Sequence, residues 1–88
     1  MQIEFHRSFK KHYKVIPENI RRQFNARLIL FEKERFNSIL NNHPLGGDRK
    51  GQWSINITGE WRAIYIYKNS ITVIFIDIVE DFCLIGLL

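Results

Sequence analysis

Hydrophobic and polar residues alternate along several short stretches of the chain, which is the pattern of a β-strand with one buried face. Ile3 and Phe5 are flanked by polar residues and predict a short opening strand. The same two-residue period runs over residues 53–58, and strands are also predicted over residues 61–67 and 71–78. The last of these is apolar at nearly every position, which favours an inner strand covered on one face by helices.

The segment between the first two predicted strands has hydrophobic residues at three- and four-residue spacing, which predicts two amphipathic helices. Ser8 is suited to cap the first helix, and Pro17 suits the first turn of the second, which is expected to end near Phe36. The hydrophobic positions are Phe9, Tyr13 and Ile16 in the first helix, and Ile20, Phe24, Leu28 and Phe31 in the second.

The predicted order of elements is β-α-α-β-β-β. Residues 37–51 contain Asn-Asn, His-Pro and Gly-Gly pairs, so we expect a loop there. A chain of 88 residues has room for one domain, and we assign residues 1–88 to it. We expect an α+β fold in which two N-terminal helices pack on one face of a mainly antiparallel four-stranded sheet.

The chain is basic, with a formal net charge of +4 and a pI near 9.5. Nine of its 13 Lys and Arg residues lie within residues 7–35. A basic half indicates an anionic partner, either a nucleic acid or an acidic protein segment. The alternative is that these cations simply form the solvated faces of the two helices.

Cys83 is the only cysteine, so an intramolecular disulfide is excluded and a zinc finger has no ligand set. His6, His12 and His43 do not fall at metal-ligand spacing, so we predict no metal and no other cofactor, and we expect His6 and His12 in the core or on the surface. The chain opens without the features of a secretory signal, and no apolar run is long enough to span a bilayer. We therefore expect a cytoplasmic protein without a membrane partner.

Residues 43–62 combine glycines, cations and aromatic rings, which is a mixture suited to RNA. Arg49 and Lys50 are expected to bind RNA phosphates, unless they belong to a solvated turn. Lys50 is also a candidate acid–base group. The imidazole of His43 can act as a base or an acid near neutral pH, and the alternative is a loop histidine pinned by the following proline.

Two tryptophans open the strands of this region. Trp53 offers a flat ring on which a base can stack, but a tryptophan at the head of an alternating strand is more often part of the core. Trp61 leaves the same two alternatives open. Ser54 and Asn56 share one strand face by the two-residue period, and they are predicted either to hydrogen-bond RNA or to face solvent.

Three segments of the chain carry a resemblance to a known family. They are Phe-Lys-Lys at residues 9–11, Asn-His-Pro-Leu-Gly-Gly at residues 42–47, and Gly-Gln-Trp-Ser-Ile-Asn-Ile-Thr-Gly-Glu-Trp-Arg at residues 51–62. Over about residues 1–78 the chain resembles the RelE/ParE superfamily of bacterial toxins from toxin–antitoxin pairs. The last segment looks more like the RNA-cleaving branch, which includes RelE, YoeB and YafQ, than like the gyrase-poisoning ParE branch.

The resemblance implies a cytoplasmic ribonuclease that cuts mRNA in the ribosomal A site and is neutralised by a cognate antitoxin wrapped on its basic surface. Metal-free cleavage of RNA uses a ribose 2′-hydroxyl as nucleophile and needs a base, cationic donors and an acid. Arg62 matches the family's catalytic arginine and is expected to clamp the phosphate. The alternative for Arg62 is an ion pair with Glu60 or Asp77.

The end of the chain departs from the family pattern. Many relatives have Asp-Ile-Gly-Thr-His after the last strand, whereas residues 77–81 here read Asp-Ile-Val-Glu-Asp, so Asp81 is the nearest stand-in for the catalytic histidine. Residues 82–88 are uncharged and almost wholly apolar, which predicts a buried tail that supports homo-oligomer formation. This ending predicts a weakened nuclease. It leaves open a catalytically impaired toxin that mainly binds its antitoxin and, less favoured, a ParE-type gyrase inhibitor.

Overall fold

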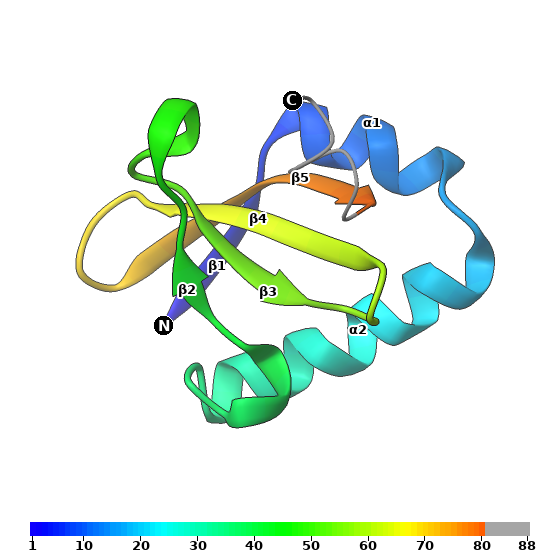
Figure 1. Cartoon of the computed structure of the whole chain (residues 1–88), viewed down its shortest axis with the longest axis horizontal. Helices are drawn as coiled ribbons and strands as arrows, with labels where there is room; N and C mark the ends of the chain where they lie inside the picture. The colour runs from blue at the N-terminus through cyan, green and yellow to red at the C-terminus, as the bar shows by residue number, and fades with distance from the viewer. Residues whose placement is uncertain (81–88) are drawn as a thin grey trace.

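The computed structural model describes residues 1–80, which form two helices packed against a twisted sheet (Figure 1). The predictions for Asp81 and for the tail of residues 82–88 lie outside these residues. The elements in chain order are β1 (Gln2–Phe5), α1 (Arg7–Val15), α2 (Glu18–Lys33), the 3-10 helix η1 (Ser38–Leu40), β2 (His43–Pro44), the 3-10 helix η2 (Gly47–Arg49), β3 (Trp53–Asn56), β4 (Trp61–Tyr67) and β5 (Thr72–Glu80).

The strands form one five-stranded sheet in the order β1-β5-β4-β3-β2. β1 pairs with β5 in parallel, and all other neighbours are antiparallel, which confirms the predicted α+β class. The additional strand is β2, which comes from the expected loop and pairs His43 and Pro44 with Ser54 and Trp53. A strand of two residues has no alternation to detect, so the sequence predicted four strands instead of five.

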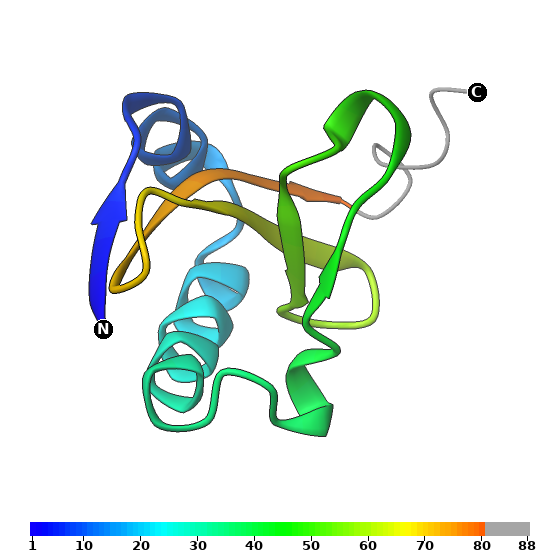
Figure 2. The ribbon, with the colours of Figure 1, turned by 90° about the vertical axis from the view of Figure 1, so that its left-hand side faces the viewer.

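Helix α2 lies across one face of the sheet, and α1 lies along β5 beyond the end of β1 (Figures 1 and 2). The two helices share one aromatic core, because the rings of Phe9 in α1 and Phe24 in α2 lie 5.2 Å apart between centroids. Both rings contact Phe75 of β5, which is fully buried and also contacts Phe31 and Tyr65. Phe75 therefore marks the core face of the sheet.

Helix α2 is shorter than the sequence predicts, because it ends at Lys33 rather than near Phe36. Glu34 leaves the helical conformation with φ −143° and ψ 84°, and the backbone N–H of Asn37 donates to its carbonyl oxygen. Phe36 is more than half exposed and packs its ring against Trp53. Within residues 1–80, no helix has both the length and the apolar character needed to cross a membrane.

The predicted cap of α1 is also wrong. His6 is the N-cap residue, and its Nδ1 accepts a hydrogen bond of 3.0 Å from the backbone N–H of Ser8. Ser8 lies inside the first turn, and its hydroxyl donates to the carbonyl oxygen of Ile76 at 2.6 Å. The serine therefore joins α1 to β5 instead of ending the helix.

Candidate functional site

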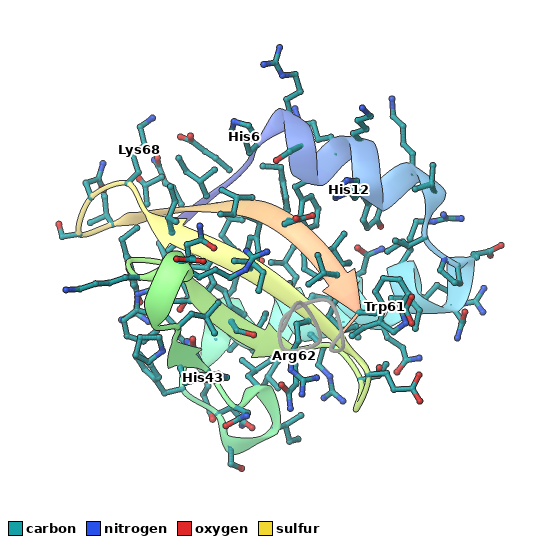
Figure 3. The ribbon with its side chains drawn as sticks, turned by 45° about the horizontal axis from the view of Figure 1, so that its top comes forward. His6, His12, His43, Trp61, Arg62 and Lys68 are labelled. Carbon is teal, nitrogen blue, oxygen red and sulfur yellow. The ribbon has the colours of Figure 1, made fainter. Side chains whose placement is uncertain are left out.

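The face of the sheet that points away from the aromatic core carries four of the predicted site residues, and we term it the outer face. Residues that are directly opposite on neighbouring antiparallel strands point to the same side of a sheet. One such row on the outer face runs from β2 to β5 and contains His43, Ser54, Ile64 and Asp77. The next row contains Asn56, Arg62 and Val79. Arg62 of this row and His43 of the first row are labelled in Figure 3.

His43 lies at the β2 edge of the outer face, and the backbone holds its ring. Its Nδ1 lies 2.7 Å from the carbonyl oxygen of Asn41. A carbonyl can only accept, so Nδ1 carries the proton and Nε2 of the neutral ring keeps its lone pair. The preceding Asn42 is fixed by the hydroxyl of Tyr65, which donates at 2.8 Å. Burial raises the pKa of Tyr65, so this phenol remains a donor.

Arg62 lies on the outer face of β4, and the neighbouring turn positions its guanidinium. Nη1 donates to three carbonyl oxygens of the β3–β4 connection, those of Thr58 at 3.1 Å, Gly59 at 3.3 Å and Trp61 at 3.4 Å. These contacts fix the orientation of the guanidinium. A planar guanidinium held in this way can present paired donors to a phosphate.

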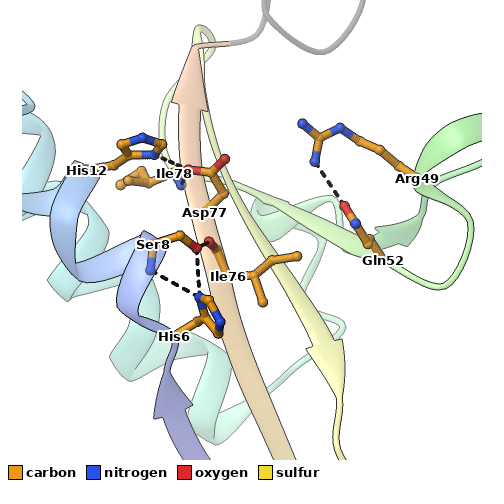
Figure 4. A network of polar contacts seen from close by, with 8 residues as sticks. All are labelled: His6, Ser8, His12, Arg49, Gln52, Ile76, Asp77 and Ile78. Carbon is orange, nitrogen blue, oxygen red and sulfur yellow. Dashed lines mark hydrogen bonds and ion pairs between the residues drawn. The ribbon is translucent and has the colours of Figure 1, made fainter.

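The loop between β2 and β3 carries Arg49 and Lys50. Gly47 and Gly51 have φ angles of 59° and 93°, which glycine adopts far more readily than residues with a side chain. Nη1 of Arg49 donates to Oε1 of Gln52 at 2.9 Å, and the side chain points from the loop toward β5 (Figure 4). Lys50 is exposed, so its ammonium is available to an anion in solvent.

Two polar atoms beside Arg62 and His43 lack partners. Oγ of Ser54 and Oδ1 of Asn56 are buried and accept or donate no hydrogen bond among residues 1–80. Buried polar atoms without partners are uncommon in folded proteins because each costs about 1–3 kcal/mol. Ser54 is fully buried, whereas the Asn56 side chain is partly exposed and is the one of the two that a ligand can contact.

Both tryptophans lie on the opposite side of the sheet from Arg62. Trp53 pairs with Tyr65, and its ring contacts Tyr65 and Tyr67 at centroid distances of 6.3 Å and 5.6 Å. Trp61 also packs against the core. Their positions favour the core alternative for both residues.

One contact of the outer face was missed by the sequence interpretation, which assigned no function to His12. Nδ1 of His12 in α1 lies 2.5 Å from Oδ1 of Asp77 in β5 (Figure 4). Asp77, which was considered as an ion-pair partner of Arg62, is thus bonded to a histidine. No cluster of three or more possible metal ligands occurs in residues 1–80.

The hydrogen bonds predict a different tautomer for two of the histidines. We expect neutral His43 to carry its proton on Nδ1, facing the Asn41 carbonyl, and neutral His6 to carry it on Nε2, because its Nδ1 accepts from Ser8. Long-range ¹H–¹⁵N NMR spectra of the neutral rings distinguish these forms. An Nε2-protonated His43 would contradict the proposed ring orientation, and His6 provides the internal reference.

Comparisons with known proteins agree with this architecture. A YoeB/ParE toxin from Agrobacterium tumefaciens is similar to the chain with a TM-score of 0.74 and 23% identity over 91% of this chain and 98% of that one. YafQ from E. coli strain BL21(DE3) has a TM-score of 0.78 and 19% identity, over 97% of this chain and 98% of that one. The RelB–RelE antitoxin–toxin complex from Methanococcus jannaschii has a TM-score of 0.72 and 19% identity, over 96% of each chain. At these identities the likeness is one of fold.

The family is identified by a match of the amino-acid sequence. The comparison with curated proteins gives no significant match. Residues 3–80 match the family described as the ParE toxin of the type II toxin–antitoxin system parDE. Because this match spans most of the chain and the fold is shared with YoeB, YafQ and RelE, the chain belongs to the RelE/ParE superfamily of toxins from type II toxin–antitoxin systems.

Proposed function

We propose that this toxin is a ribosome-dependent endoribonuclease that cleaves mRNA by metal-free attack of a ribose 2′-hydroxyl. The observation that carries the proposal is the arrangement of His43 and Arg62 on neighbouring rows of the outer face. This arrangement provides a proton acceptor with a defined free nitrogen and a cation suited to phosphate on the same surface. The resemblance of residues 42–62 to the RNA-cleaving branch supports mRNA in the ribosomal A site as the substrate.

The reaction begins when Nε2 of His43 accepts the proton of the 2′-hydroxyl. The 2′-oxygen forms a bond to the adjacent phosphorus, and Arg62 stabilises the negative charge that develops on the phosphorane. The bond between phosphorus and the 5′-oxygen of the next nucleotide then breaks. The products are a 2′,3′-cyclic phosphate and a 5′-oxygen that must receive a proton.

The remaining polar residues bind the RNA on either side of the reacting phosphate. Arg49 and Lys50 contact backbone phosphates from the glycine-containing loop between β2 and β3. The exposed position of Lys50 favours this function over acid–base chemistry. Asn56, which is partly exposed on the row of Arg62, contacts ribose or base groups, whereas Ser54 is fully buried and does not touch the RNA. Trp53 has no part in the proposed RNA contact.

A second candidate function follows from the family match, because residues 3–80 match the ParE toxin family. Toxins of the ParE branch poison gyrase, so the second candidate is a gyrase inhibitor. A toxin that mainly binds its antitoxin and cuts little is the third possibility. The experiments below separate these three functions.

Arg62→Ala is expected to lower cleavage of translated mRNA by about 10²–10³, because removing one donor to a developing oxyanion typically costs about 2.7–4 kcal/mol. The measurement is primer extension on mRNA from a cell-free translation reaction that contains the purified toxin. Thermal unfolding of the variant checks that the β3–β4 connection, which Arg62 also contacts, remains folded.

Arg22→Ala is the matched control, since Arg22 is exposed on α2 and pairs only with Glu18 among residues 1–80. A variant at Arg62 that cuts as well as the parent would remove the proposed site. A parent that cuts no mRNA but blocks DNA supercoiling by purified gyrase would establish the second candidate instead. A parent that does neither, and still binds its antitoxin, would establish the third.

Arg49→Gln combined with Lys50→Gln is expected to weaken binding to single-stranded RNA and to flatten its salt dependence. Loss of two phosphate contacts should reduce the slope of log K against log salt by about 1.4. The same change at Arg22 and Lys33 on α2 is the control. An unchanged slope for the Arg49 and Lys50 variant would place those side chains in solvent.

We also propose that the antitoxin docks in a groove between α1 and α2. The groove has a volume of about 480 Å³ and is lined by Phe5, Phe9, Lys10, Tyr13, Lys14, Phe24, Asn25 and Leu28. Its wall is apolar, while Lys10 and Lys14 are exposed at its side. This combination fits an amphipathic segment that carries acidic residues beside its apolar face.

Reversing the charge of both Lys10 and Lys14 to Glu is expected to raise the Kd for the antitoxin at least tenfold, which corresponds to about 1.4 kcal/mol. The antitoxin is the small protein encoded beside the toxin and recovered with it from the native host. Arg22→Glu with Lys33→Glu makes the same charge change outside the groove and should bind as the parent does. Equal affinities for both double variants, or the absence of any such partner, would exclude this docking surface.

A further inference from the structure

His12 and Asp77 form a histidine–carboxylate pair with one nitrogen directed away from the carboxylate. The carboxylate oxygen of Asp77 accepts from Nδ1 of His12 at 2.5 Å, so the proton of the neutral ring sits on Nδ1. The backbone N–H of Ile78 also donates to the same carboxylate oxygen at 2.8 Å, which fixes the carboxylate. The side chain of His12 is 47% exposed, whereas that of Asp77 is 22% exposed. A carboxylate that orients one ring nitrogen leaves the other as an acid–base group.

An irregularity in β5 builds this pair. Tyr65 of β4 pairs with Phe75, and the preceding residue, Ile64, pairs with Asp77. Ile76 is therefore an extra residue in the ladder. Such a bulge bends the strand and re-aims the side chains beside it. The carbonyl of Ile76 accepts from Ser8, and Asp77 reaches the next turn of α1.

The pair borders the outer face on the side opposite His43. Asp77 ends the row that starts at His43, and it is a diagonal neighbour of Arg62, which pairs with Val79. Diagonal neighbours on adjacent strands lie about 7–8 Å apart. In the sheet, β4 with Arg62 lies next to β5, and β3 separates β4 from β2, which carries His43. Figure 4 shows Asp77 on β5, with His12 on one side of the strand and Arg49 on the other.

A purely structural function explains the pair poorly. α1 is already tied to β5 by the Ser8 hydroxyl and by the backbone N–H of His6, which donates to the carbonyl of Phe75 at 2.8 Å. Phe9 of the same helix is buried in the aromatic core. A solvent-exposed ion pair adds little to the stability of such an interface.

The geometry points to His12 as the general acid of the proposed RNA cleavage, with Asp77 as its positioning residue. This inference rests on the proposed nuclease function. Nε2 of protonated His12 gives its proton to the 5′-oxygen as the bond from phosphorus to that oxygen breaks. His43 receives the 2′-hydroxyl proton on the other side of the phosphate, so one proton enters the protein and one leaves it. His12 would then provide an acid in a chain that has Asp81 where relatives have a histidine that contributes to cleavage.

The test uses ribosomes programmed with a short synthetic mRNA that carries a single cleavable A-site codon. His12→Gln is expected to cut this mRNA about 10²-fold or more slowly than the parent, since a positioned acid contributes about 10²–10⁴. Asp77→Asn should lose at least about tenfold through disturbed orientation of the ring. In a second mRNA, sulfur replaces the 5′-oxygen at the cleavage site, and this leaving group departs without a proton. Both variants should cut the sulfur-containing mRNA within about threefold of the parent, because the acid is no longer needed.

His6→Asn is the matched control, because asparagine preserves the N-cap acceptor of α1 while removing a histidine that does not contact Asp77. It should cut both mRNAs as the parent does. His12→Gln with parental activity on the ordinary mRNA overturns the inference and leaves the nuclease function intact. A defect that persists on the sulfur-containing mRNA also overturns it, since this result indicates a structural function. A parent that cuts neither mRNA overturns the nuclease proposal and this inference together.

Discussion

The register between β4 and β5 determines which side chains of this sheet are buried and which can meet a ligand. Tyr65 and Phe75 pair on the core face, where each is fully buried in one aromatic cluster. The side-chain period of a strand is two residues, so a slip of one residue would turn Arg62 into the core and Ala63 outward. The cost of exposing those rings and burying a guanidinium makes such a slip strongly unfavourable. The aromatic core thereby fixes the chemistry of the opposite face.

The bulge at Ile76 shows how the same sheet accommodates a helix at its edge. β1 ends at Phe5, opposite Phe75, so β5 has no strand partner on that side beyond this point. The Ser8 hydroxyl and His12 imidazole then bond to Ile76 and Asp77 in place of a further strand. The backbone carbonyl of Ile76, which an extended ladder would have used for strand pairing, accepts instead from the Ser8 hydroxyl of α1.

The sequence predicted those parts of the molecule that depend on local periodicity. The two helices and the β4 strand follow from spacing alone, and so does the shared face of Ser54 and Asn56. The sequence placed Arg62 on a strand but did not assign it to that face, because this assignment depends on the length of the turn between β3 and β4. The end of α2 was misplaced because residues 32–35, Glu-Lys-Glu-Arg, are good helix formers without a stop signal, while polar contacts around Glu34 turn the chain.

The contact between His12 and Asp77 could not have been predicted in the same way. The two residues are 65 positions apart, and their approach depends on one extra residue in β5 and on where β1 ends. Neither feature leaves a periodic signal. The strand β2 was missed for a related reason, because its two residues pair only once β3 is in place beside them.

The elements that carry the outer-face residues differ in rigidity, and the difference matches what each residue would do. Arg62 and Asp77 lie on paired inner strands, and His12 lies on a helix tied to β5 by Ser8. Groups that act on a reacting atom must be held within about 0.5 Å of the productive geometry, which strands and helices achieve better than loops. Arg49 and Lys50 lie instead on a loop with two glycines at positive φ, where the chain can adjust to an RNA backbone of variable path. In the proposed reaction, the fold thus separates fixed chemistry on the sheet and helix from adaptable phosphate binding on the loop.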